Sequence, residues 1–268
     1  IALHSLLTIS SVTVLSSPTH IAGILPARWG STRFPGKPLH RLGGKTLIQH
    51  VWERCMECRM LDSIVIATDD ERIRDEALSF GAKVTMTAAD HPTGTDRIAE
   101  AVLAIPEATH IINIQGDEPL IDPALIDELA SALANDAALP MVTAANPIDD
   151  DAALNDPNVV KVVLDLNGHA LYFSRSPLPY QRNKPAGLIL YRHKGIYGYR
   201  RDFLETFITW PPSLLEQAES LEQLRALENG ARIKVIVTLD DSIGLDTPEQ
   251  AVLIEAQLLS RPSHNTNH

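Results

Sequence analysis

Apolar and polar positions alternate with two different periods along the first half of the chain. Short apolar runs typical of buried strands lie at residues 21–25, 63–68, 82–86, 110–115 and 139–145. Stretches with a helical spacing of apolar side chains lie between them, at residues 45–60, 71–80, 96–105 and 123–134. Strands that alternate with helices are joined by right-handed crossovers, so their sheet is parallel and carries helices on both faces. The pattern therefore predicts an α/β fold with three α/β/α layers and a mostly parallel sheet.

The second half of the chain has a different pattern. Residues 159–166 and 170–174 flank the dipeptide Asn167-Gly168, which indicates an antiparallel hairpin. Residues 176–190 are polar and rich in Pro and Gly, which favours a loop. The remaining pattern predicts strands at 195–199 and 232–239 and helices at 201–209, 214–228 and 247–259. We therefore expect a smaller antiparallel lobe, at about residues 157–230, built onto the main sheet.

The length of 268 residues suits one large domain, which we place at residues 20–260. Residues 1–19 are apolar and rich in Ser and Thr, and they lack the basic start of a signal peptide. We expect them to form a disordered leader, and residues 261–268 to form a frayed tail.

The charge and composition of the chain limit the kinds of partner that it can bind. The net charge is −11 and no run of Lys or Arg occurs, which disfavours a nucleic-acid partner. No segment of the sequence is long and apolar enough to cross a membrane. Cys55 and Cys58 have C-x-x-C spacing inside a predicted helix, and the second pair that a zinc site requires is missing from the sequence. We interpret them as ordinary thiols of a reducing cytosol.

The stretch from Pro26 to Leu39 follows the first predicted strand and concentrates positive charge. It carries Arg28, Arg33 and Lys37 among glycines, prolines and small hydroxyl residues. Glycines let backbone N–H groups approach an anion closely, and clustered cations repel one another unless an anion lies between them. The spacing of the glycines differs from that of a P-loop and of a dinucleotide-binding fingerprint. The stretch predicts a polyphosphate site at the carboxyl end of a strand, and the alternative is a solvated basic loop.

Polar side chains also follow the other predicted strands. Asp69 follows the second strand, Gln115 and Asp117 follow the fourth, and Asp246 follows the last. Ligands of open α/β sheets bind at the carboxyl ends of strands, so we expect these groups to converge. Two carboxylates opposite a cationic loop suit a hydrated Mg²⁺ that bridges phosphates. The alternatives are a turn-stabilising role for Asp117 and a helix N-cap for Asp246.

Several segments together resemble one enzyme family. The loop at residues 26–39, Gln115-Gly116-Asp117-Glu118-Pro119 and Leu245-Asp246-Thr247-Pro248-Glu249 are similar to motifs of the 3-deoxy-manno-octulosonate (Kdo) cytidylyltransferases. The similarity continues through residues 67–69, 89–97, 172–175, 193–199 and 221–225. It covers roughly residues 20–257.

The resemblance implies a Rossmann-like sheet of the nucleotide-diphospho-sugar transferase type. It also implies the transfer of CMP from CTP to Kdo, with release of pyrophosphate, for lipopolysaccharide biosynthesis in the cytoplasm. The implied cofactor is Mg²⁺, held by Asp117 and Asp246, and the implied assembly is a homodimer formed through the second half of the chain. The implied catalytic residues are Arg28, Lys37, Asp117 and Asp246.

The resemblance also assigns the two substrates to different residues. The residues expected on the CTP side are Ala27, Arg28, Arg33, Lys37, Asp69, Thr95 and Arg97. The residues expected on the sugar side are Gln115, Arg175, His193, Tyr197, Glu222 and Gln223. Arg175 suits the Kdo carboxylate because a guanidinium binds a carboxylate through two hydrogen bonds. The alternatives are a surface histidine for His193, a core residue for Tyr197 and a solvated helix face for Glu222 and Gln223.

Two other functions are compatible with the sequence. The first is a cytidylyltransferase for another acidic sugar, such as 8-amino-Kdo or sialic acid, since the phosphate loop and the metal pair would serve equally there. The second is a nucleotide-binding regulator without catalysis, which would not need the metal pair. An oxidoreductase is disfavoured because the dinucleotide fingerprint is missing.

Overall fold

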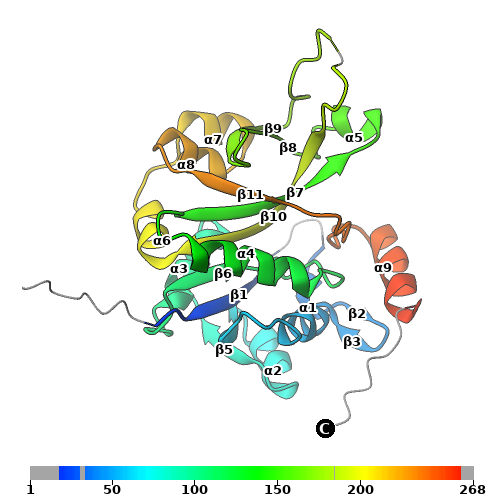
Figure 1. Ribbon diagram of the computed structural model, residues 1–268. Helices are drawn as coiled ribbons and strands as arrows, with labels where there is room; N and C mark the ends of the chain where they lie inside the picture. Colours follow the sequence, from blue (N-terminus) through cyan, green and yellow to red (C-terminus); the bar gives the residue numbers. More distant parts are fainter. Residues whose placement is uncertain (1–17, 31–33, 184, 261–268) are drawn as a thin grey trace, which may run out of the picture.

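The computed structural model describes residues 18–30, 34–183 and 185–260 (Figure 1). Within these ranges the chain forms a nine-stranded mixed sheet. Seven strands follow one another in the order β11 (Ile233–Val237), β7 (Met141–Ile148), β10 (Leu190–Arg200), β6 (His110–Asn113), β1 (Ile21–Ala27), β4 (Ser63–Thr68) and β5 (Lys83–Met86). β6, β1, β4 and β5 are parallel, whereas β10 is antiparallel to both of its neighbours. The expected leader and tail lie almost wholly outside the described residues, at 1–17 and 261–268, and remain predictions.

Helices cover both faces of the sheet. α1 (Leu47–Met56), α2 (Glu71–Ser79) and α4 (Pro123–Asn135) pack on one face, and α3 (Gly94–Val102), α6 (Arg201–Phe207) and α8 (Gln223–Glu228) pack on the other. Side chains of β1 alternate between the two cores, with Ala22 and Ile24 in one and Ile21 and Leu25 in the other. A strand buried on both faces explains the continuous apolar run in the sequence. The predicted three-layer α/β/α fold is confirmed.

The predicted hairpin of the second half is also present. β8 (Lys161–Leu164) pairs with β9 (Ala170–Ser174), and β8 in turn pairs with β10 at Tyr191 and Arg192. The hairpin therefore extends the main sheet, at the end of the molecule opposite α2 (Figure 1). α5 (Asp151–Asn155) precedes it, and α7 (Leu214–Glu219) follows α6.

β10 is longer than the sequence predicts. We expected a strand only at residues 195–199, but the strand begins at Leu190, inside the segment expected to be a loop. β10 lies between β7 on one side and β6 and β8 on the other, so partner strands satisfy its backbone groups along its length. Hydrogen bonding to distant strands thus outweighs the weak local pattern.

Two predicted helices differ in their extent. The helix expected at 214–228 is divided into α7 and α8, because Ser220 adopts the left-handed conformation (φ 52°) and ends α7. The helix expected at 45–60 begins at Leu47, because β2 (Arg41–Leu42) and β3 (Lys45–Thr46) form a small hairpin before it. The same helix ends at Met56, so Cys55 lies within α1 and Cys58 lies beyond its end. Burial raises the pKa of Cys58 to about 12 and also raises that of Cys55.

A third, smaller core fixes α9 (Pro248–Ser260) beside the β2–β3 hairpin (Figure 1). Leu42 and Leu47 pack there with Leu245, Ala251 and Ile254. Gly43 N also donates to Glu255 Oε1 at 2.7 Å. This packing brings the segment before α9 next to the carboxyl end of β6. In the part of the chain that the structure describes, no helix has the length and apolar character needed to span a bilayer.

Candidate active site

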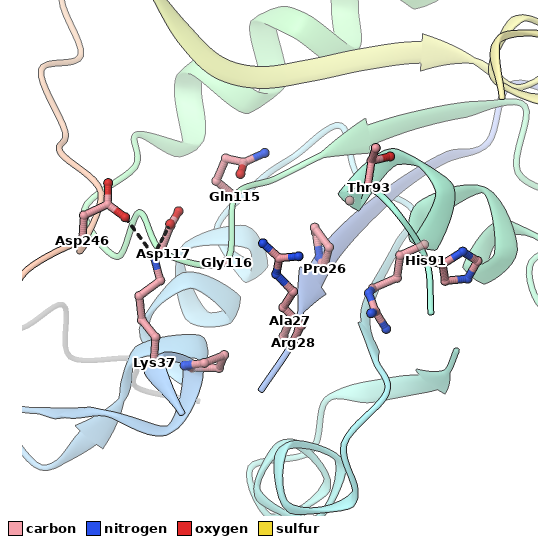
Figure 2. A pocket seen from close by; sticks show the side chains of 13 residues that line it. Pro26, Ala27, Arg28, Lys37, His91, Thr93, Gln115, Gly116, Asp117 and Asp246 are labelled. Carbon is pink, nitrogen blue, oxygen red and sulfur yellow. Dashed lines mark hydrogen bonds and ion pairs between the residues drawn. The ribbon is translucent and has the colours of Figure 1, made fainter. Parts of the chain in front are cut away.

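A cavity of about 310 Å³ opens at the carboxyl ends of β1 and β6 (Figure 2). Its lining comes from four parts of the chain: β1 and the segment that follows it, including η1 (Lys37–Leu39), the start of α3, the loop after β6 and the segment before α9. The residues are Pro26, Ala27, Arg28, Lys37, Pro38, His91, Thr93, Gly94, Arg97, Gln115, Gly116, Asp117 and Asp246. The structure thus brings together cations and carboxylates that the sequence places far apart.

Lys37 contacts both predicted metal-binding carboxylates. Its Nζ lies 2.6 Å from Asp117 Oδ2 and 3.2 Å from Asp246 Oδ1 (Figure 2). Lys37 opens η1 directly after Gly36, which has a left-handed backbone (φ 67°). A Cβ at Gly36 would lie only 2.8 Å from the Trp29 ring, so a glycine is required on two grounds. The glycine therefore helps to aim Lys37 at the two acids.

Trp29 supports the same turn from its other side. The Gly36 amide donates to the Trp29 carbonyl at 3.2 Å. The guanidinium carbon of Arg72, on α2, lies 3.3 Å from the centre of the Trp29 ring. Trp29 is thus held between the glycine turn and the second helix. Arg33 lies outside the described residues, so its expected role in CTP binding remains a prediction.

Asp117 is placed by the close approach of two strand ends. A Cβ at Gly116 would lie 2.9 Å from the Pro26 carbonyl oxygen, so only glycine lets the loop after β6 pack against β1. The Leu245 amide donates to the Asp117 carbonyl at 2.8 Å. Leu245 is fully buried, and Asp246 follows it directly. The two carboxylates are therefore linked through the backbone as well as through Lys37.

The cap of α9 is made by the neighbours of Asp246. Gln250 N donates to Thr247 Oγ1 at 3.4 Å, and Thr247 N donates to Gln250 Oε1 at 2.9 Å. The Asp246 amide donates to the same Gln250 oxygen at 2.6 Å. The Asp246 carboxylate, meanwhile, reaches Lys37 in the cavity. The sequence pattern thus does mark a capped helix start, but the capping side chains are those of Thr247 and Gln250.

The two carboxylates suit a metal ion that is bound by substrate phosphates as well as by the protein. Mg²⁺ is commonly held by one or two carboxylates together with water and substrate phosphates. Asp117 and Asp246 converge on one cation, the Lys37 ammonium group. In the ranges that the structure describes, no group of three or more His, Cys, Asp or Glu side chains is arranged to hold a metal. The pair therefore fits a metal whose remaining ligands would be water and the phosphates of a nucleotide.

The residues expected on the CTP side occupy different places. Ala27 and Arg28 line the cavity, as does Arg97, which is buried. Arg97 Nη2 lies 3.4 Å from Asp69 Oδ2, so Asp69 supports Arg97 without lining the cavity itself. Thr95 is not part of the cavity lining, and its Oγ1 donates to Glu222 Oε2 at 2.6 Å.

The sugar-side residues are less closely grouped. Gln115 lines the cavity, whereas the other five residues of that expected group lie outside its lining. The His193 and Tyr197 rings lie 5.3 Å apart on β10, and His193 Nε2 lies 2.9 Å from Thr143 Oγ1. Burial lowers the pKa of His193 to about 3, so the ring is neutral. Both rings are half-buried, so His193 is not a fully exposed surface histidine.

Gln223 and Arg175 contrast in their hydrogen bonding. Gln223 is buried, and its Nε2 has no hydrogen-bond partner among the described residues. The Arg175 guanidinium donates to the Glu219 carbonyl at 2.7 Å and to the Pro157 carbonyl at 3.0 Å. Gln223 thus has an unused donor, whereas Arg175 is bound to backbone oxygens in this structure.

Sequence reasoning missed the contribution of the segment before α3. Three residues of that region, His91, Thr93 and Gly94, line the cavity, although none of them was predicted as a site residue. His91 pairs with Glu100, and Thr93 Oγ1 accepts from the Asp96 amide at 3.2 Å as the N-cap of α3. The signal for Thr93 was its position three residues before Asp96, a spacing that marks a helix start.

Comparisons with known proteins agree with this arrangement. Residues 22–233 match the family model described as Cytidylyltransferase. A protein of Syntrophotalea carbinolica named 3-deoxy-manno-octulosonate cytidylyltransferase is 51% identical over 89% of this chain and 98% of its own. One of the same name from Geobacter sulfurreducens is 52% identical over 85% of this chain and 95% of its own. A solved structure of CMP:2-keto-3-deoxy-manno-octonic acid synthetase complexed with CTP is 41% identical, with a TM-score of 0.86 over 90% of this chain and 99% of its own.

Proposed function

This chain belongs to the 3-deoxy-manno-octulosonate cytidylyltransferase family, and from that premise we propose that it transfers CMP from CTP to Kdo at the cavity described above. The anomeric hydroxyl oxygen of Kdo forms a bond to the α-phosphorus of CTP, and the bond from that phosphorus to the β-phosphate oxygen breaks. Pyrophosphate leaves, and the proton of the hydroxyl group passes to solvent. The product, CMP-Kdo, is an activated sugar for lipopolysaccharide assembly.

The cations of the first loop are suited to the triphosphate. The Arg28 guanidinium extends into the cavity and is exposed to solvent, where a nucleotide can reach it (Figure 2). Lys37 lies nearby with its ammonium group inside the same cavity. Phosphoryl and nucleotidyl transfer depend on positioning and electrostatic stabilisation more than on covalent catalysis. We assign Arg28 and Lys37 the role of holding the triphosphate and offsetting the negative charge that grows on the phosphate oxygens.

The acidic pair is suited to Mg²⁺. Asp117 and Asp246 would hold the ion, which when bound orients the phosphate and the sugar hydroxyl and makes that hydroxyl more acidic. The observation that carries the proposal is that one ammonium group contacts both carboxylates beside Arg28. A site that only binds a nucleotide needs the cations Arg28 and Lys37, whereas a site for nucleotidyl transfer also needs the two carboxylates that would hold the metal.

The sugar side is supported by groups that lie beyond the cavity lining. Glu222 accepts a hydrogen bond from Thr95 at the start of α3, and Gln223 follows it with an Nε2 that has no partner in the part of the chain that the structure describes. His193 and Tyr197 are neighbours on β10. These groups offer acceptors, donors and ring faces for a sugar with many hydroxyls. We propose that they contact Kdo, and that Arg175 leaves its backbone partners to bind the Kdo carboxylate.

We also propose that the protein acts as a homodimer in the cytoplasm, where CTP is available. The segment before β10 exposes apolar side chains, with Tyr180 at 88%, Leu188 at 41% and Ile189 at 54% of their full exposure. Trp210, later in the same half of the chain, packs against Phe203 and Phe207 and is not part of this patch. Light scattering should give a dimer mass for the native protein and a monomer mass for a Tyr180→Ser, Leu188→Ser variant.

The reaction is tested by measuring pyrophosphate release in the presence of Mg²⁺. CTP, UTP, ATP and GTP are each combined with Kdo, 8-amino-Kdo and sialic acid. Rapid release with CTP and Kdo alone would support the proposal. Faster release with another acidic sugar would keep the chemistry and replace the substrate. Tight CTP binding without release for any pair would refute the enzyme and favour a nucleotide-binding regulator.

A further inference from the structure

Lys194 on β10 has a buried ammonium group that the proposed reaction does not use. The residue retains 7% of its full exposure. Its Nζ lies 2.9 Å from Ser242 Oγ, 3.2 Å from Asp240 Oδ2 and 3.6 Å from Glu118 Oε2. It also donates to the backbone carbonyls of Ser242 at 3.1 Å and Asp240 at 3.3 Å. One ammonium group therefore joins three separate segments of the chain.

Two of these segments carry the proposed metal ligands. Glu118 directly follows Asp117 in the loop after β6. Asp240 and Ser242 lie in the segment between β11 and α9 that leads to Asp246. Ser242 Oγ lies within hydrogen-bonding distance of both carboxylates, at 2.9 Å from Asp240 Oδ2 and 3.3 Å from Glu118 Oε2. The network thus links the two segments through contacts other than those of Lys37.

The balance of charge in the network depends on Lys194. Glu118 and Asp240 retain only 12% and 7% of their side-chain exposure, so both carboxylates are largely removed from water. Without the ammonium group, two buried carboxylates would face each other unpaired, and their segments would separate to regain solvent.

We propose that Lys194 is a positioning residue that holds Asp117 and Asp246 at the separation a divalent metal requires. The inference rests on the proposed role of this pair as metal ligands. The Leu245–Asp117 backbone bond, at 2.8 Å, fixes the two segments at one point, and the Lys194 network fixes them at a second. Two attachment points restrict rotation of one segment against the other, which a single bond would allow.

The inference is tested with Mn²⁺ as the probe. A Lys194→Met variant keeps the length of the apolar stem and removes the charge. Loss of a group that orients metal ligands weakens metal affinity by about 10- to 100-fold. We expect an Mn²⁺ dissociation constant at least about tenfold higher, measured by electron paramagnetic resonance on the nucleotide-free protein. Amide exchange of residues 238–246 should become faster, and the Mg²⁺ concentration for half-maximal rate should rise while the KM for CTP at saturating Mg²⁺ stays the same.

Lys161→Met is the matched control. Lys161 is also fully buried, but its ammonium group donates to the backbone carbonyls of Asp156, Val159 and Arg175, away from the two carboxylates. This variant should lose stability without a change in Mn²⁺ affinity. Ser242→Ala is a milder variant of the network itself, which should raise the Mn²⁺ dissociation constant even if Lys194→Met fails to fold.

The inference would be overturned if Lys194→Met left both the Mn²⁺ affinity and the amide exchange of residues 238–246 unchanged. If Lys194→Met does not fold, the same result in Ser242→Ala would overturn it. Lys194 would then contribute to the fold alone. An Asp117→Asn variant separates this outcome from a failure of the proposed function. If Asp117→Asn abolishes Mn²⁺ binding while Lys194→Met and Ser242→Ala do not affect it, only the positioning role is refuted. If Asp117→Asn also retains full binding, the proposed metal pair itself is wrong.

Discussion

The Lys37 ammonium group lies 2.6 Å from the Asp117 carboxylate, and it also reaches Asp246 at 3.2 Å. The two acids are 80 and 209 residues away from Lys37 in the sequence. In the absence of a ligand, this cation offsets the repulsion that two converging carboxylates would otherwise experience. We therefore expect Lys37 to have two functions that can be separated experimentally: it offsets the charge of the two acids, and, as proposed above, it contacts the triphosphate of the substrate.

Replacement of Lys37 by Met should strengthen the binding of metal and weaken the use of CTP. The repulsion between a unit charge and a divalent ion about 4 Å away is worth about 2 kcal/mol in a watery environment, so Mn²⁺ should bind the nucleotide-free variant about 30-fold more tightly. The value of kcat/KM for CTP should fall by about 100-fold or more, because a group that stabilises the developing charge is lost. Metal titration and steady-state pyrophosphate release measure the two effects. Weaker Mn²⁺ binding would show that Lys37 does not compete with the metal.

Arg28 should matter for the nucleotide and not for the fold. Its guanidinium is exposed in the cavity, so Arg28→Met should leave the thermal midpoint unchanged and lower kcat/KM for CTP by about 100-fold. Arg59→Met provides the control, because Arg59 is exposed in the loop after α1, outside the cavity lining. Equal activities of the two variants would remove Arg28 from the catalytic group.

The buried side-chain amide of Gln223 should affect stability and sugar binding in opposite directions. Its buried Nε2 is unpaired among the described residues, which costs a folded protein about 1–3 kcal/mol. A Gln223→Leu variant removes that cost with little change in volume, so its free energy of unfolding should increase. Its KM for Kdo should rise at least about tenfold, the effect of about 1.4 kcal/mol of lost binding, while its KM for CTP should not change. A less stable variant with an unchanged KM for Kdo would contradict both parts.

His193 predicts a pH dependence of stability. Burial lowers the pKa of His193 to about 3 in the folded protein, whereas the unfolded chain titrates near 6.5. Between these values the unfolded chain binds a proton that the folded chain does not, so the stability from this group is lost as the pH falls through that window. The loss amounts to at most about 1.4 kcal/mol per pH unit. Urea unfolding of the native protein and of His193→Gln between pH 4 and 8 should give a smaller pH dependence for the variant, and equal slopes would refute the assignment.

The sequence predicts the first half of the fold well because its signals are local. The run that forms β1 is apolar at every position that faces either core, and the glycines at 36 and 116 are needed for a left-handed turn and a close strand approach. The second half was less predictable because its structure depends on distant pairing. β10 begins in a polar stretch, and the break between α7 and α8 falls at Ser220, a residue that rarely adopts a left-handed backbone.

The site was predictable in its charges but not in its supporting contacts. The positions of Lys37, Asp117 and Asp246 follow from the rule that ligands bind at the carboxyl ends of strands. The buried network of Lys194 was not foreseen, because lysine side chains are usually exposed. Its partners, Glu118 and Asp240, are brought to it by the crossing of three segments, which no local pattern encodes.

The proposed reaction depends most on Asp117 and Asp246, which we propose to hold the metal at which CMP is transferred. The direct measurement is CMP-Kdo formation from CTP and Kdo, followed against Mg²⁺ concentration for the native protein, Asp117→Asn and Asp246→Asn. The proposed metal role predicts Mg²⁺-dependent synthesis by the native protein, and rates lower by at least about 100-fold in both variants with the fold retained. Synthesis by either variant at the native rate and with the native Mg²⁺ dependence would contradict it.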